Sequence, residues 1–251
     1  MGRLFYATLL AIGVSLMFGA LSVFMVEQQE YASARDEYAQ LREAFAGSVE
    51  DVVGLKPGGV SVIETVHAMS VDEVSKTAAE RLRLSVLTEI NSDFVGWLTI
   101  DGTTVDYPVV RGRDNEIYLD TLFTGWRNQS GAVFMDYRCE KGFNSPVSIL
   151  YGHNMQDGSM FAPLSRYLDS VFLADHPEIT ITTPEGETLS YQVFEVKLTD
   201  AWDPAYSVGF PEDEAPVTYT GTSGEAKRIL ILSTCVKSAG KDARLLVYSE
   251  T

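Results

Sequence analysis

The hydrophobic pattern of the chain opens with an uninterrupted apolar run, since residues 4–26 contain no charged side chain. As a helix rising ~1.5 Å per residue, this run would be about 34 Å long, enough to cross a hydrocarbon core of ~30 Å. Gly19 and Ala20 lie inside the run, whereas the small residues of a signal-peptide cleavage site follow the apolar region. The pattern predicts an uncleaved anchor, with residues 1–26 forming a cytoplasmic tip and a transmembrane segment.

The charges that flank the apolar run predict its orientation. Arg3 and the amino terminus precede the run, and Glu27 and Glu30 follow it. Cytoplasmic flanks of membrane helices carry the excess of positive charge. We therefore expect a single-pass protein of the cell membrane, with a cytoplasmic N-terminus and everything after Val26 outside the cell.

Beyond the anchor, the apolar positions of residues 27–46 recur at intervals of three and four, which is typical of one helix face. This stripe could pair with a second chain. Two heptads are too few to define a coiled coil, so we expect the stripe to pack locally. The stripe consists of Tyr31, Ala34, Tyr38, Leu41 and Phe45.

A second helical segment is predicted after a break. The stretch "GLKPGG" at residues 54–59 is typical of a linker. Ser70 begins the sequence S-V-D-E, a capping box that ends at Glu73, and the helix is expected to run to about Ile90. Residues 27–90 are thus predicted to form an extracytoplasmic helical stalk, a linker and an N-terminal helix.

From Phe94 onward the pattern changes to short strands separated by turn residues. Residues 95–110, "VGWLTIDGTTVDYPVV", predict a hairpin of the type I′ kind through Asp101-Gly102. "PEGE" at residues 184–187 predicts a turn between two strands, and residues 159–168 predict a short crossing helix. Six further strands are predicted at 131–135, 147–152, 178–182, 188–197, 228–234 and 243–249.

Eight short strands with few helices favour a mainly β fold, a closed or nearly closed barrel formed by residues 91–251. The formal net charge of −16 argues against a nucleic-acid partner, because phosphate binding requires lysine and arginine. The acidic run at residues 212–214 lacks the ligand spacing of an EF-hand loop. We expect neither a metal nor a cofactor.

Cys235, one of two cysteines, follows an apolar run, which leaves three interpretations open. It could be a packed core thiol, half of a disulfide with Cys139, or a nucleophile. A nucleophilic thiol needs a thiolate, and a histidine partner is the usual means of obtaining one. His153 directly follows a buried-looking strand, whereas His67 and His176 are expected to be solvated or locally bonded.

Arg244 lies within the apolar strand "ARLLVY". A buried guanidinium needs an anion or a carbonyl partner. If the strands that hold Cys235 and Arg244 pair through the turn "VKSAGKD", both side chains reach the same end of the barrel. The pair then fits a nucleophile with a group that stabilises a carbonyl or an oxyanion.

"YGHNM", followed by "LSTC" and an arginine nine residues later, resembles the histidine, cysteine and arginine motifs of sortases, the membrane-anchored cysteine transpeptidases of bacterial surfaces. "VGWLTIDGTTVDYPVVRGRDNEIYL", "GAVFMDYR" and "ILYGHNMQDGSMFAPLSRY" are similar to the class B branch. The resemblance covers residues 90–251 and implies an eight-stranded sortase-type barrel with an N-terminal helical appendage.

The resemblance also implies roles. Cys235 would attack the threonine carbonyl of a sorting signal on a surface protein, His153 would be the acid and base, and Arg244 would hold the carbonyl. The partners would be surface proteins that bear this signal and an amine acceptor, either a peptidoglycan precursor or a pilin-like subunit. Five residues match family positions near the substrate cleft, although each could equally be packing: Asn115, Leu119, Tyr206, Ser233 and Thr234.

One departure concerns the segment at residues 207–227. Class B sortases carry a long insertion with a helix here, whereas this segment has two prolines and is not expected to form a long helix. The recognised sorting signal therefore stays open. Two alternative functions are another cysteine acyl-transferase or peptidase of the cell wall, and a membrane-tethered β-domain without enzyme activity. The order of His153 before Cys235 argues against the first, and Arg244 against the second.

Overall fold

The computed structural model describes residues 2–46, 76–207, 227–236, 240 and 242–251. Several predicted features lie outside these residues, namely the linker at 54–59, the helix start at Ser70, His67, the acidic run at 212–214 and nearly all of the segment at 207–227.

The described strands form a closed barrel, which confirms the predicted mainly β fold. Their order around the barrel is β1-β2-β3-β4-β7-β8-β6-β5, and β5 pairs back with β1. Closure removes the free strand edges at which sheets otherwise aggregate. The strands are β1 Phe94–Thr99, β2 Asp106–Val110, β3 Val133–Met135, β4 Val147–Tyr151, β5 Glu178–Thr182, β6 Thr188–Asp200, β7 Ile229–Cys235 and β8 Ala243–Glu250.

The continuous apolar run of β7 is explained by burial on both faces. Leu230 and Leu232 pack into the interior of the barrel, while Ile229 and Ile231 belong to a second, outer cluster that includes Ala205. A strand buried on both sides has no polar face, so it shows a run rather than an alternation. This burial fixes the position of the strand that ends at Cys235.

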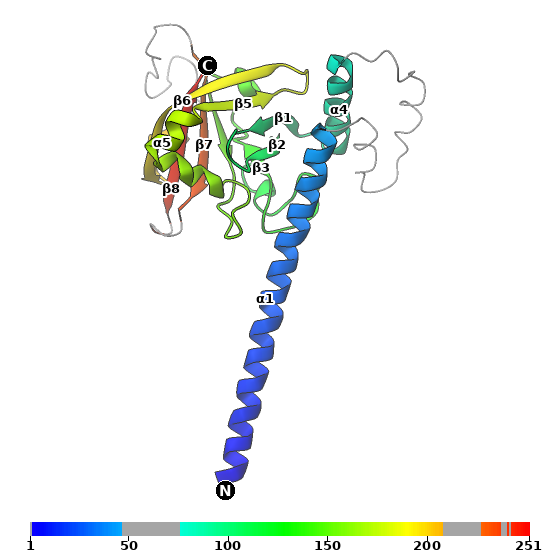
Figure 1. Ribbon diagram of the computed structural model, residues 1–251, viewed down its shortest axis with the longest axis vertical. Coiled ribbons are helices and arrows are strands. Elements are labelled where there is room, and N and C mark those ends of the chain that lie inside the picture. Colours follow the sequence, from blue (N-terminus) through cyan, green and yellow to red (C-terminus); the bar gives the residue numbers. More distant parts are fainter. Residues whose placement is uncertain (1, 47–75, 208–226, 237–239, 241) are drawn as a thin grey trace, which may run out of the picture.

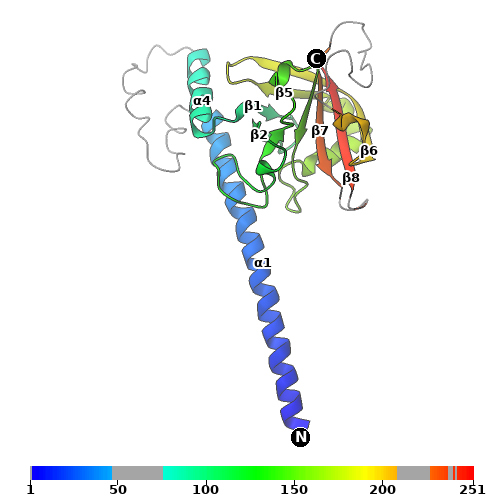
Figure 2. The ribbon, with the colours of Figure 1, turned by 180° about the vertical axis from the view of Figure 1, so that it is seen from behind.

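Helix α1, Gly2–Ala46, joins the apolar run and the predicted stalk without a break. Figures 1 and 2 show it extending from one side of the barrel, with α4, Lys76–Ile90, beside its C-terminal end. Its first part is long and apolar enough to cross a membrane, and none of this apolar stretch is buried in the protein.

The stripe on α1 packs locally, as predicted. Leu41 is 0% exposed and Tyr38 is 2% exposed in the core that α1 shares with the barrel. The ring of Phe45 stacks on Trp97 of β1 with a centroid distance of 4.2 Å. The part of α1 that follows the apolar run is therefore packed into the core of the barrel rather than forming a free stalk.

The predicted hairpin through Asp101-Gly102 is confirmed, because β1 and β2 pair antiparallel, but its type I′ turn is wrong, because Gly102 has a positive φ and Asp101 does not. The turn is longer because Ile100 and Val105 extend the pairing through a hydrogen bond of 2.9 Å from the Ile100 amide to the Val105 carbonyl. The hydroxyl of Thr103 then donates to the Ile100 carbonyl and accepts from the Val105 amide, which closes a wider loop.

The predicted helix at 159–168 is a 3₁₀ helix, η4, over Ala162–Leu168, followed by a short α-helix, α5, Ser170–Asp175. The predicted turn at 184–187 is confirmed, since the Thr183 amide donates to the Glu187 carbonyl at 2.8 Å. The other 3₁₀ helices are η2 Ile117–Leu119, η3 Gly142–Asn144 and η5 Pro204–Tyr206.

Candidate active site

The parallel pairing of β4 and β7 brings His153 and Cys235 to the same end of the barrel. Tyr151 lies opposite Ser233 in the register, and each candidate residue follows two positions later in its own segment. The amide of Asn154 donates to the Cys235 carbonyl at 2.8 Å, and the hydroxyl of Thr234 donates to the Gly152 carbonyl at 2.8 Å. These bonds extend the alignment of the two segments beyond the last strand pair.

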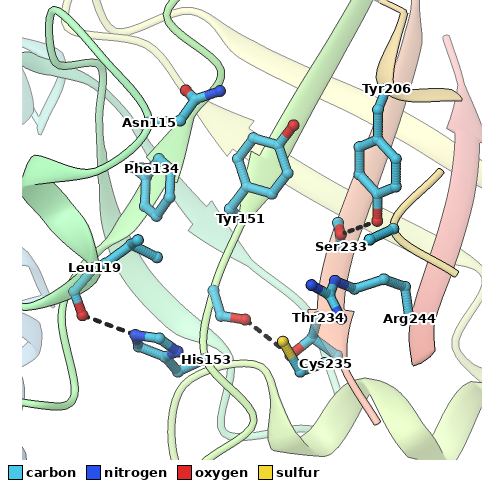
Figure 3. A pocket seen from close by; sticks show the side chains of 12 residues that line it. Asn115, Leu119, Phe134, Tyr151, His153, Tyr206, Ser233, Thr234, Cys235 and Arg244 are labelled. Carbon is cyan, nitrogen blue, oxygen red and sulfur yellow. Dashed lines mark hydrogen bonds between the residues drawn. The ribbon is translucent and has the colours of Figure 1, made fainter. Parts of the chain in front are cut away.

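Arg244 reaches the same end through the antiparallel pairing of β7 and β8, in which it lies opposite Cys235. The neighbouring pair is Thr234 with Leu245, and both of these residues are buried. The pairing that was expected through the turn "VKSAGKD" is confirmed. In the view of Figure 3, the thiol of Cys235 lies between His153 and the guanidinium of Arg244.

These side chains line one open pocket with a volume of about 300 Å³. The pocket brings together all eight residues proposed from the sequence as catalytic or substrate-binding (Figure 3). Four further residues complete its lining: Phe134, Tyr151, Gly152 and Ala201.

The imidazole of His153 is held by a backbone carbonyl. Its Nε2 lies 2.7 Å from the carbonyl oxygen of Leu119. Because a carbonyl oxygen can only accept a hydrogen bond, the shared proton belongs to Nε2. The other ring nitrogen, Nδ1, faces the side of the pocket where Cys235 lies (Figure 3).

Asp136, directly after β3, makes hydrogen bonds that hold together the residues of one pocket wall. Its side chain is 0% exposed and accepts hydrogen bonds from Asn115 at 2.9 Å, from the Tyr151 hydroxyl at 2.9 Å and from the Arg138 guanidinium at 2.8 Å. Burial raises the pKa of Asp136, but the hydrogen bonds, above all from Arg138, outweigh it and hold the pKa below its usual value. The wall is therefore built on a buried carboxylate.

Tyr206 forms the facing part of the pocket, as predicted for a wall residue. Its hydroxyl lies 2.8 Å from the Ser233 hydroxyl, and its carbonyl accepts from the Arg138 guanidinium at 2.9 Å. Burial raises the pKa of Tyr206, while the Ser233 hydrogen bond and the positive charge of Arg244 oppose this. The phenol consequently stays neutral and can donate a hydrogen bond.

The other cysteine and a second histidine lie away from the pocket lining. Cys139 is buried, and both it and Cys235 are free thiols, so the disulfide interpretation is wrong. His176 packs against the ring of Phe172 at 4.7 Å, the local role expected for it. Within the described part of the chain, no cluster of three or more His, Cys, Asp or Glu side chains could hold a metal ion.

The comparison with protein families decides between the alternatives. Residues 98–251 match the model of the sortase domain. The chain belongs to the sortase family. Sortase B of Listeria monocytogenes is 37% identical over 171 residues, which are 67% of this chain and 67% of that protein.

Solved structures place this sortase in class B. A Staphylococcus aureus sortase B in complex with substrate has a TM-score of 0.65 and 26% identity, covering 88% of this chain and 97% of that one. A class B sortase from Streptococcus pyogenes involved in pilus biogenesis has a TM-score of 0.56 and 30% identity, covering 66% of this chain and 96% of that one. The protein is thus a cysteine transpeptidase of the cell wall, and not another class of acyl-transferase or a passive β-domain.

Several residues that shape the pocket were missed from the sequence. Asp136 and Arg138 stand in the segment "GAVFMDYR", where an aspartate directly after a short apolar strand was an available signal. The role of Leu119 was also unforeseen, because the contact to His153 uses its backbone carbonyl rather than its side chain. A contact made by the backbone does not restrict the residue type, so the sequence carries no signal of it.

Proposed function

We propose that this class B sortase cleaves the C-terminal sorting signal of a surface protein and joins the new carboxyl end to an amine. The amine belongs to a peptidoglycan precursor or to a pilin-like subunit. The observation that carries the proposal is the convergence of Cys235, His153 and Arg244 on one open pocket. That sortases act on sorting signals, and that the Staphylococcus aureus relative was solved with its substrate, supports the substrate class.

In the first half of the reaction, the thiol of Cys235 gives its proton to Nδ1 of His153, and the resulting thiolate attacks the threonyl carbonyl carbon of the signal. Arg244 donates hydrogen bonds to the carbonyl oxygen as it gains negative charge, which lowers the barrier. The C–N bond then breaks, and the leaving amine takes a proton from Nδ1 of His153. The products are a thioester on Cys235 and a released C-terminal peptide.

In the second half, the acceptor amine attacks the thioester carbon and gives a proton to Nδ1 of His153. The C–S bond breaks, an amide forms, and Cys235 leaves as the thiolate. Throughout, the Leu119 carbonyl keeps the proton on Nε2, so that every proton transfer in the reaction takes place at Nδ1. The cycle needs no cofactor.

The rest of the pocket would bind the sorting signal. Asn115 and the exposed side chain of Leu119 form one side, and Tyr206 with Ser233 forms the other. Thr234 is 3% exposed, which suits a positioning role more than direct contact. A groove of this kind, apolar with a few fixed hydrogen-bonding groups, is typical of a peptide site.

Residues 4–26 would hold the enzyme in the cell membrane, with the N-terminus in the cytoplasm and the catalytic domain outside. In support, the side chains from Ile12 to Val26 are exposed on every side of α1, as in a helix solvated by lipid. The mature protein should then retain Met1 or Gly2 and sediment with membranes. A mature N-terminus between Ala20 and Glu30 would show a cleaved leader instead.

The enzymatic proposal is tested with the full chain in detergent, a library of sorting-signal peptides and two kinds of acceptor. Mass spectrometry should show an acyl adduct on Cys235 and, after addition of amine, the joined product. Cys235→Ala should give neither, whereas Cys139→Ala, the matched control, should give both. Product formed by Cys235→Ala would refute the proposal, and the acceptor that yields product tells cell-wall anchoring from pilin joining.

A further inference from the structure

Tyr38 on α1 makes a long-range hydrogen bond to the barrel. Its hydroxyl donates to the Gly131 carbonyl at 2.7 Å, and both residues are buried. Tyr38 belongs to the helix that carries the membrane anchor, whereas Gly131 precedes β3. Glu37 and Glu30 of the same helix also bind this segment, at Thr124 and Asn128, but Tyr38 makes the contact nearest to β3, at Gly131.

From Gly131 the connection continues to the carbonyl that holds His153. Gly131 has a φ of +56°, and a Cβ at this position would lie 2.7 Å from the Leu119 carbonyl oxygen. The amide of the next residue, Ala132, donates to the Tyr118 carbonyl at 3.0 Å. The backbone at Gly131 thus packs directly against the Leu119 peptide, so a shift of one moves the other.

A second connection leaves the ring of Tyr38 toward the loop that follows His153. The ring meets Tyr107 edge-on, with the centroids 5.1 Å apart, and the Tyr107 hydroxyl accepts from the Met160 amide at 3.0 Å. Met160 has a φ of +56° and pairs with Asn154, and the Phe161 amide donates to the His153 carbonyl at 2.9 Å. The loop at residues 153–161 is therefore held together by its own backbone hydrogen bond and is also bound to Tyr107.

We propose that Tyr38 is a positioning residue for His153, holding both the loop that presents the imidazole and the Leu119 carbonyl that orients it. The inference rests on the proposed function, in which His153 transfers the protons. Through Tyr38, helix α1 then helps to set the geometry of the active site. Removal of the Tyr38 hydroxyl would leave the Gly131 carbonyl buried without this donor, and its segment would relax away from His153.

The test compares Tyr38→Phe with Tyr31→Phe in the full chain. Tyr31 lies on the same helix, is also buried, and donates to Glu27 within that helix at 2.6 Å. Tyr38→Phe should lower kcat roughly 10- to 100-fold, the scale of a catalytic group that is slightly misplaced. The KM for the sorting peptide should stay within about twofold, since peptide contacts remain. Tyr31→Phe should match the wild type in both.

A spectroscopic readout separates positioning from general destabilisation. With ¹⁵N-labelled histidine, the ring signals of His153, assigned with His153→Ala among the three histidines of the chain, should show one fixed Nε2–H form in the wild type. Tyr38→Phe should show a mixture of both ring tautomers. An unchanged kcat, or a lower kcat with unchanged ring signals, would overturn the inference. If His153→Ala were as active as the wild type, the proposed function itself would fail, which is a distinct result.

Discussion

Asp136→Asn should destabilise the protein out of proportion to the one atom that it changes. The carboxylate lies at the centre of five hydrogen bonds: three from Arg138, one from Asn115 and one from Tyr151. An asparagine keeps the Oδ1 acceptor. It replaces Oδ2 with an NH₂ group, which cannot accept from the three donors that meet there.

The magnitude follows from burial. Removing one partner of a buried ion pair costs about 3–5 kcal/mol. The Arg138 side chain is 33% exposed, so water compensates part of this loss and the figure falls to about 2–3 kcal/mol. For a chain of this size, this corresponds to a fall in Tm of roughly 4–12 °C.

The effect should depend on pH. Because the pKa of Asp136 is held below its usual value in the folded protein, the unfolded chain takes up the proton first, near its pKa of ~3.9. The stabilisation is therefore complete above about pH 5 and is lost as the pH falls through the folded pKa. The gap between wild type and Asp136→Asn should shrink below about pH 4.

Urea unfolding of the detergent-solubilised chain at several pH values measures this gap. Asp120→Asn is the matched control, since Asp120 is paired with Arg127 at the surface and its side chain is 47% exposed. It should cause no measurable change, as is usual for surface pairs. A loss in Asp136→Asn no larger than in this control, or a gap that stays constant from pH 7 to pH 3, would refute the reasoning.

Three further expectations concern individual side chains. Burial raises the pKa of the Cys139 thiol to about 11, so at pH 8 a thiol reagent should label Cys235 first, and equal labelling of native protein by peptide mass spectrometry would contradict this. Leu41→Ala should cost about 2–5 kcal/mol in thermal unfolding, because Leu41 is 0% exposed on α1; an unchanged Tm would mean that α1 does not stabilise the barrel. Arg244→Lys keeps the charge but loses the planar fork, so turnover should fall about 10²-fold with little change in Tm; normal turnover would remove Arg244 from the catalytic set.

Much of the fold could be predicted because its strands have short, local signals. The limits of β5 are those expected, and β7 and β8 differ from prediction by a residue at their ends. The type of the turn between β1 and β2 was mispredicted because Thr103 provides side-chain hydrogen bonds that compete with a two-residue turn. Whether such side-chain bonds form depends on the angle at which the chain returns from β1 into β2.

The site was predictable as a set of residues and, for Cys235 and Arg244, as a pair of neighbouring strands, but the strand pairing that places His153 beside them was not. Motif resemblance singled out Cys235, His153 and Arg244, whose chemistry restricts the residue types that can serve. The order of strands, with β7 inserted between β4 and β8, depends on contacts between distant parts of the chain and has no local signal. For the same reason, the contacts of α1 with Gly131 and Tyr107 could not be inferred from the stripe alone, which indicated only that some surface would be covered.

The parallel register of β4 and β7 has a consequence for how such an enzyme can diversify. Since Tyr151 is locked opposite Ser233 by the strand pairing, His153 and Cys235 stay level whatever the length of the chain that joins them. Residues can therefore be gained or lost between the two strands without changing the alignment of His153 and Cys235. A single insertion inside either strand would instead flip its side chains and separate the pair. Chimeras that exchange the chain between Tyr206 and β7 should thus retain the chemistry.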